Sequence, residues 1–166
     1  MPDGNVLLIS YELKNAAEVV QAGCAQSIIM WPDKIVEIQP VGTNGGNVVW
    51  EWHAWDHLVQ DHDATKSNYG VVADHPELLN VNFNTTKDWM HMNGIDYNAT
   101  LDQITFSSHN LNEIYVIDHS TTTAEAAGHS GENSGMLLLP IITGPPSAAH
   151  RLPTTEAHSS CPTAIC

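Results

Sequence analysis

Basic residues are scarce in this chain of 166 residues, which has 5 Lys and Arg against 19 Asp and Glu and a formal net charge of −14. Proteins that bind nucleic acid need clusters of Lys and Arg to contact the phosphates, so no nucleic-acid partner is expected. Long hydrophobic runs are also missing, and none approaches the roughly 20 apolar residues that span a bilayer. The sequence therefore predicts a protein without a nucleic-acid partner and without a membrane span.

Cysteine is rare too, and its spacing excludes two kinds of small stabilised domain. Cys24, Cys161 and Cys166 are an odd number with no Cys-x-x-Cys pair. They predict neither a disulfide framework nor a zinc finger.

The two ends of the chain differ from its middle. The first residues lack the charged and apolar regions of a secretory signal, and a strand pattern begins almost at once. After residue 135 the alternation of polar and apolar residues is lost, and Glu156 is the only acidic residue. We expect a fragment of a longer protein, or a chain that associates with others through open sheet edges. No fold is assigned to residues 136–166.

Residues with β-sheet propensity form two short runs in the second half of the chain. The runs at 104–106 and 114–117 are rich in β-branched and aromatic residues, and turn-forming residues occupy 98–100 and 110–112. Together they predict antiparallel strands joined by tight turns. Residues 5–10 and 34–38 resemble 103–108 and 113–117 in the same order, which indicates an internal repeat.

Three further elements are predicted in and after the first repeat. The Ala-rich segment 16–22, followed by Gly23, predicts a short helix with a glycine stop. Gly45, Gly46 and Asn47 indicate a hairpin that leads into a strand at 48–52. A second short helix is expected at 75–79, within a long connection.

Ten histidines raise the question of a metal site. Three of them lie with three aspartates between residues 53 and 63, as His53, Asp56, His57, Asp61, His62 and Asp63. Their spacing matches no standard zinc pattern and lacks the glycine and glutamate of a calcium loop. Solvated side chains at the end of a strand are the favoured interpretation, and a metal hydrolase is the weaker alternative.

Three tryptophans, Trp50, Trp52 and Trp55, precede and interleave with this segment. Aromatic patches near carboxylates bind carbohydrates or proteins without any catalysis. A binding module that uses these tryptophans is therefore the main alternative to an enzyme.

His91 and Asn93 form the strongest candidate site. In a strand, residues i and i+2 project to the same side, so the imidazole and the amide would point together while Met90 and Met92 face the other way. An imidazole beside an amide is suited to a small anionic group.

The residues around this pair resemble the bacterial arylsulfotransferases that work without a nucleotide sulfate donor. The resemblance covers about residues 3–135, and its most specific feature is the Trp-x-His-x-Asn run within 89–97. The other segments that carry it are 3–8, 49–58, 107–110 and 116–120.

The resemblance implies an all-β fold of the β-propeller type. A blade has four antiparallel strands in roughly 40 to 50 residues, so this chain is too short for a whole propeller. We expect about two blades with a short helical insertion. Blade A would span about residues 3–58, a connection 59–87, and blade B about 88–128, within a partial propeller of residues 1–135.

The activity implied is transfer of a sulfuryl group from an aryl sulfate ester to a phenol through a sulfo-histidine, with no cofactor and no metal. His91 is assigned as catalytic, and Asn93 and His109 as substrate-binding. His109 stands where many members have an arginine, which supplies more charge than an imidazole. The nucleophile is expected in a later blade, so the chain alone is predicted to be inactive. Location in the periplasm or outside the cell is also implied.

Overall fold

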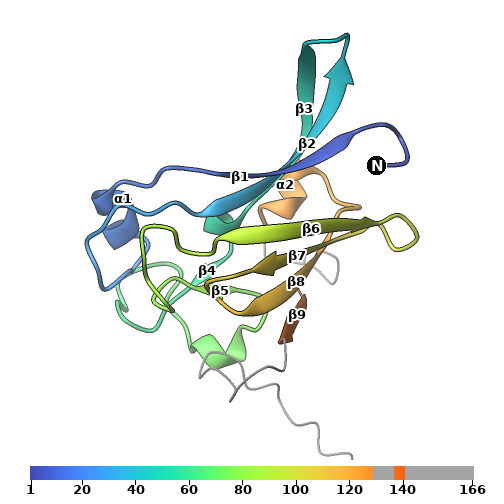
Figure 1. Ribbon diagram of the computed structural model, residues 1–166. Coiled ribbons are helices and arrows are strands. Elements are labelled where there is room, and N and C mark those ends of the chain that lie inside the picture. The colour runs from blue at the N-terminus through green and yellow to red at the C-terminus, as the bar shows by residue number, and fades with distance from the viewer. Residues whose placement is uncertain (129–136, 141–166) are drawn as a thin grey trace, which may run out of the picture.

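The computed structural model describes residues 1–128 and 137–140, and most of its regular structure is β-strand in antiparallel sheets (Figure 1). The first sheet has the order β1-β2-β3 and is formed by Val6–Tyr11, Asp33–Val41 and Gly45–His53. The second has the order β6-β7-β8-β9 and is formed by Met92–Asn98, Gln103–Ser108, Glu113–Asp118 and Leu137–Pro140. The prediction of an all-β fold is confirmed, and both sheets are open in the described residues.

The strands of each sheet follow one another along the chain, as the repeat indicated. The first sheet has three strands in the described residues, whereas a blade was expected to have four. The fourth strand of the second sheet is β9, which pairs with β8 although no fold was assigned to its segment. The remainder of the tail, 141–166, lies outside the described residues.

The connection between the sheets carries structure of its own. The short strands β4 (Leu58–Val59) and β5 (Leu79–Asn80) form a parallel pair. Single turns of 3-10 helix occur at η1 (Ala54–Asp56) and η2 (Val72–Asp74). The helix expected at 75–79 is wrong, because these residues form turns that lead into β5.

The tight turns show why the strands end where they do. The Asn98 side chain accepts hydrogen bonds from the backbone N–H groups of Thr100 and Leu101, which closes the turn between β6 and β7. The hairpin between β2 and β3 turns at residues 42–44, with Gly42 at φ 62°. Gly45 and Gly46 already belong to β3, so the predicted turn lies three residues too late.

Helix α1 (Ala16–Gln21) confirms the predicted helix and its glycine stop. Asn15 caps its start through a capping box with Glu18. Gly23 follows the helix at φ 81°, a backbone conformation that disfavours any residue with a Cβ atom. A second short helix, α2 (Thr123–Ala126), lies against β3.

Replacing Gly23 by alanine is expected to lower the free energy of unfolding by about 2 to 4 kcal/mol. The new Cβ would lie 2.6 Å from Cδ of Gln60. Gln60 is fully buried and is held by its bonds to the backbone of His62 and Asp63, so it cannot move aside.

Gly4→Ala is the matched control for Gly23→Ala. Gly4 has a similar φ of 89°, but nothing lies within 4 Å of its added Cβ. Gly4→Ala should therefore lower the free energy of unfolding only by the cost of a Cβ atom in a left-handed backbone conformation, about 1 to 2 kcal/mol. Urea unfolding measures both variants, and equal losses would show that contact with Gln60 is unimportant.

The core joins the inner faces of the two sheets. The Trp52 ring contacts the Phe106 ring at 5.4 Å between centroids, and Phe106 stacks on Tyr115 at 4.8 Å. Trp50 is also buried and donates its indole N–H to the carbonyl of Thr121. The binding-module alternative is therefore wrong in its main feature, because two of its three tryptophans belong to the core.

Strands β1 and β6 are edge strands of their sheets and lie side by side (Figure 1). Two pockets lie along this junction, one towards each end of the strands. The junction thus places the start of β6, where the candidate site lies, against β1 and the first residues of β2.

Candidate functional site

His91 lies just before β6 and not within it. Its φ is 51°, in the left-handed region that a residue with a side chain rarely occupies. The prediction that His91 and Asn93 share one face of a continuous strand is therefore wrong, because the backbone of His91 is not extended and the strand begins only at Met92. The predicted separation of side chains is nevertheless present, since His91 and Asn93 are exposed while Met90 and Met92 are buried.

Asp88 holds the His91 ring. Its Oδ2 lies 2.6 Å from Nδ1 of His91. This hydrogen bond, together with the negative charge of Asp88, raises the pKa of His91 above its ordinary value. His91 is therefore charged over a wider pH range than a free imidazole, which favours contact with an anion and donation of a proton.

Asn93 and His109 are close to His91. The rings of His91 and His109 meet edge to face, with 5.5 Å between centroids, and the His109 backbone N–H donates to the His91 carbonyl. The Oδ1 atom of Asn93 accepts a hydrogen bond from Ser107, which leaves its amide N–H group as a donor. All three predicted site residues are exposed at one corner of the second sheet, here termed the His91 corner (His91, Asn93 and His109).

Asp33 joins the His91 corner to the first sheet and was missed by the sequence analysis. Its side chain is 7% exposed, and its Oδ2 accepts a hydrogen bond of 3.0 Å from the backbone N–H of Met92. Burial raises the pKa of Asp33 to about 6, and the charge of Asp88 adds to this effect. The Met92 N–H and the charge of His91 act in the opposite direction.

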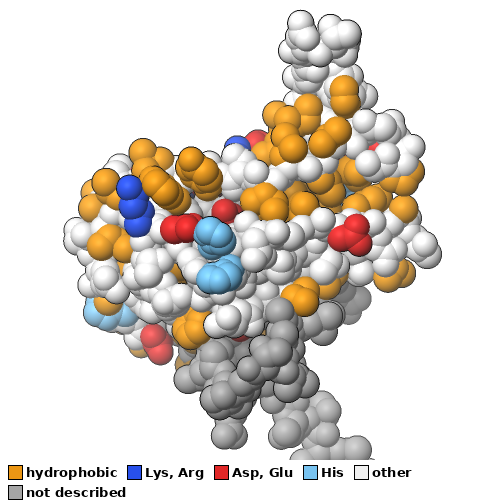
Figure 2. Space-filling model, viewed as in Figure 1, with side chains coloured by type: hydrophobic (Ala, Val, Ile, Leu, Met, Phe, Trp, Pro, Cys, Tyr) orange, Lys and Arg blue, Asp and Glu red, His pale blue; other side chains and the backbone are white. Residues whose placement is uncertain are grey.

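A pocket of about 260 Å³ lies beside these groups. Tyr11 and Trp31 form one part of its wall, with their rings stacked at 5.4 Å, and Nζ of Lys87 lies 4.1 Å from the centre of the Trp31 ring. The lining residues are Ile9, Ser10, Tyr11, Trp31, Asp33, Asp88, His91 and Met92. Figure 2 shows histidines beside carboxylates, with hydrophobic surface and a basic side chain nearby.

The raised pKa of Asp33 predicts a pH dependence of stability. The folded protein holds this proton up to about pH 6, whereas the unfolded chain loses it near pH 4. Between these values the folded state binds more protons, so this group makes the free energy of unfolding fall as pH rises. Asp33→Asn keeps an acceptor for the Met92 N–H but has no titrating carboxyl group. Its free energy of unfolding should therefore lack the decrease that Asp33 causes between about pH 4 and pH 6.

Urea unfolding between pH 4 and pH 7 measures the difference between the two proteins. Asp61→Asn is the control, because Asp61 is an exposed carboxylate. If the free energy of unfolding changes with pH in the same way for the wild type and Asp33→Asn, the raised pKa of Asp33 is refuted.

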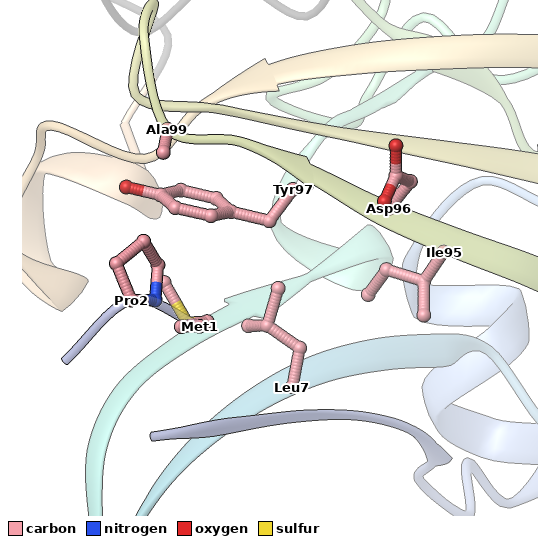
Figure 3. Close-up of a pocket in the computed structure, with 7 residues that line it drawn as sticks. All are labelled: Met1, Pro2, Leu7, Ile95, Asp96, Tyr97 and Ala99. Atoms are coloured by element: carbon pink, nitrogen blue, oxygen red, sulfur yellow. The ribbon is translucent and has the colours of Figure 1, made fainter. Parts of the chain in front are cut away.

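The second pocket of the junction, of about 320 Å³, lacks such a group of titratable side chains. Its walls are Met1, Pro2, Leu7, Ile95, Asp96, Tyr97 and Ala99 (Figure 3). Leu7 and Ile95 meet from opposite strands, and the Tyr97 hydroxyl is already bonded to Asp102. That bond raises the pKa of Tyr97 to about 12, which makes the phenol a poor acid.

The histidines of the 53–63 segment do not converge. His53 contacts Glu12, at 3.1 Å from its Nδ1, whereas His57 is buried and stacks on Trp52 at 5.0 Å. Among residues 1–128 and 137–140, no three His, Cys, Asp or Glu side chains are grouped to hold a metal ion. The metal-hydrolase alternative therefore has no ligand set in this part of the chain.

His119 has a structural position that the sequence did not indicate. Its Nε2 lies 2.8 Å from Glu37 of the first sheet, and its Nδ1 lies 2.8 Å from Asp102 in the turn between β6 and β7. His129 lies outside the described residues.

The sequence matches the arylsulfotransferase (ASST) family over residues 1–126, which include the whole His91 corner and the pocket beside it. The chain belongs to the arylsulfotransferase family. Neither the curated proteins nor the solved structures contain a match to it. Membership makes the chain transferase-like, with aryl compounds as the implied substrates. None of its described helices is long and apolar enough to span a membrane.

Proposed function

We propose that the arylsulfotransferase chain described here contributes a sulfuryl-binding site to the transfer of a sulfuryl group from an aryl sulfate ester to a phenol. The observation that supports this most is the His91 corner, where an imidazole with a raised pKa, an amide donor and a second imidazole share one exposed surface. Sulfuryl oxygens carry negative charge, and such donors stabilise them.

His91 is the proposed catalytic residue of this site. As an imidazolium it would donate hydrogen bonds to the sulfuryl oxygens and a proton to the leaving phenolate. Asp88 already occupies Nδ1, so Nε2 is the atom that would face the substrate. Asn93 and His109 would bind the remaining oxygens of the sulfuryl group, with less charge than the arginine of many family members.

The covalent step is assigned to a histidine outside the His91 corner. A nucleophilic imidazole must be neutral, and the Asp88 hydrogen bond favours the charged form of His91. The sulfo-histidine would then form in a later blade of a β-propeller, of which the two sheets are neighbouring blades. This arrangement predicts no transfer by the chain alone. Membership of the family suggests a periplasmic or extracellular location.

The assay that tests this function is the transfer of the sulfuryl group from 4-nitrophenyl sulfate to phenol. It should be run on this chain and on a version completed with further blades of the family, with release of 4-nitrophenol and formation of phenyl sulfate both measured. Transfer by the completed version supports the proposal. Release of 4-nitrophenol without phenyl sulfate would indicate a hydrolase instead.

A further inference from the structure

Asp33 presents a carboxylate oxygen to the pocket beside the His91 corner. The side chain is more than nine-tenths buried, and the Met92 N–H is bonded to its Oδ2. Within the described residues its Oδ1 accepts no hydrogen bond. Oδ1 is not fully enclosed, so it is accessible from the pocket that Asp33 lines, where a ligand with a hydroxyl group can donate a hydrogen bond to it.

The pocket has the size and the wall for a single aromatic ring. Its volume of about 260 Å³ lies just below the range of about 300 to 1,000 Å³ that is usual for drug-sized ligands. The stacked Tyr11 and Trp31 rings supply aromatic surface, against which an aryl ring packs edge to face or offset. Ile9 and Met92 complete an apolar lining around Asp33.

We infer that this pocket is a phenol-binding subsite in which Asp33 exchanges a proton with the phenolic hydroxyl group. The inference rests on the proposed sulfuryl transfer and deepens it, because it gives the aryl group a place and its proton a carrier. His91 lines the same pocket, so the sulfuryl site and the aryl site are adjacent.

The proton balance of the transfer step is simple. The phenolic O–H bond breaks and its proton goes to Oδ1 of Asp33, while the phenolic oxygen forms the new S–O bond. The bond between sulfur and its donor group breaks, and its electron pair leaves with the donor group. Asp33 then loses this proton to solvent before the next turnover, and His91 protonates the phenolate that departs from the aryl sulfate.

The surroundings of Asp33 suit this exchange. The titratable groups that face it are Asp88 and His91 before β6 and Tyr11 on β1. With a pKa of about 6, Asp33 is mostly ionised at neutral pH and ready to accept, yet it is a much stronger base than an exposed carboxylate.

Phenol binding by this chain, followed by NMR through the Trp31 indole signal, tests the inference without requiring activity. At pH 7.5 the wild type should bind phenol, and Asp33→Asn should bind it about tenfold more weakly, because the amide cannot act as a charged acceptor. Asp61→Asn should bind like the wild type. The wild-type affinity should weaken as pH falls from 7 to 5, and that of Asp33→Asn should not.

Anisole, the methyl ether of phenol, distinguishes the contribution of the hydroxyl group to binding from the contribution of ring packing. It has no hydroxyl group, so it should bind the wild type and Asp33→Asn equally, which also shows that the variant keeps its pocket. Equal phenol affinities for the two proteins, or a ligand that does not perturb Trp31, would overturn the inference. Phenol binding that depends on Asp33, together with no sulfuryl transfer by the version completed with further blades, would support the subsite and refute the proposed function. Transfer with no effect of Asp33→Asn on phenol binding would refute the subsite alone.

Discussion

Replacing His91 by alanine is expected to lower kcat for sulfuryl transfer by about 100-fold to 1,000-fold in the completed protein. The variant loses a proton donor and a charged hydrogen-bond donor to the sulfuryl oxygens, and each is worth about this much in other enzymes. His91 is exposed, so the fold should tolerate the change. Initial rates with 4-nitrophenyl sulfate and phenol measure the effect.

Two variants make the His91 result specific. His62→Ala removes an exposed histidine that does not line the pocket and should leave kcat unchanged. Asp88→Asn keeps His91 but removes the charge that raises its pKa. As pH increases, the variant should therefore lose activity at a lower pH than the wild type does. If His91→Ala retains full activity, or if the pH profile ignores Asp88→Asn, the catalytic role of His91 is refuted.

His119→Ala is expected to lower the free energy of unfolding by about 3 kcal/mol. Glu37 is 4% exposed, and His119 is one of its two hydrogen-bonding partners, the other being Asn5. The same ring holds the pKa of Asp102 below its ordinary value and contacts the rings of Trp50 and Tyr97. Its removal leaves a buried carboxylate short of a partner and opens space between the sheets.

Urea unfolding at pH 7 measures this loss, with His62→Ala as the control that should change stability by less than about 0.5 kcal/mol. The double variant with Glu37→Ala should lose less than the sum of the two single variants, because Glu37 then has no charge to leave unpaired. Strict additivity would show that the hydrogen bond between His119 and Glu37 contributes little.

Local sequence patterns predicted what depends on neighbours along the chain. The apolar alternation of 104–106 and 114–117 placed β7 and β8, and Gly23 marked the end of α1. Trp50 and Trp52 are two residues apart on one strand, so the same alternation could have indicated that both face the core.

The candidate site was predicted only in part, for a physical reason. His91 and Asn93 were identified from their spacing and from the family resemblance, and His109 from the resemblance. Their proximity follows from the pairing of β6 with β7. Asp33 is 59 residues from its partner Met92, and His119 is 82 residues from Glu37. No periodicity records contacts between sheets at such separations. The left-handed backbone of His91 also has no local marker, since glycine or asparagine is usual there.

The way in which the sheets are joined has a consequence for folding kinetics. Each sheet pairs strands that are neighbours in the sequence, so it closes shorter loops than the bonds from Asp33 to Met92 and from His119 to Glu37, which join residues 59 and 82 positions apart. Contacts between distant residues form late, after the local hairpins. Weakening the His119 bonds should therefore accelerate unfolding while leaving the refolding rate almost unchanged, so the lifetime of the native state depends on the junction between the sheets.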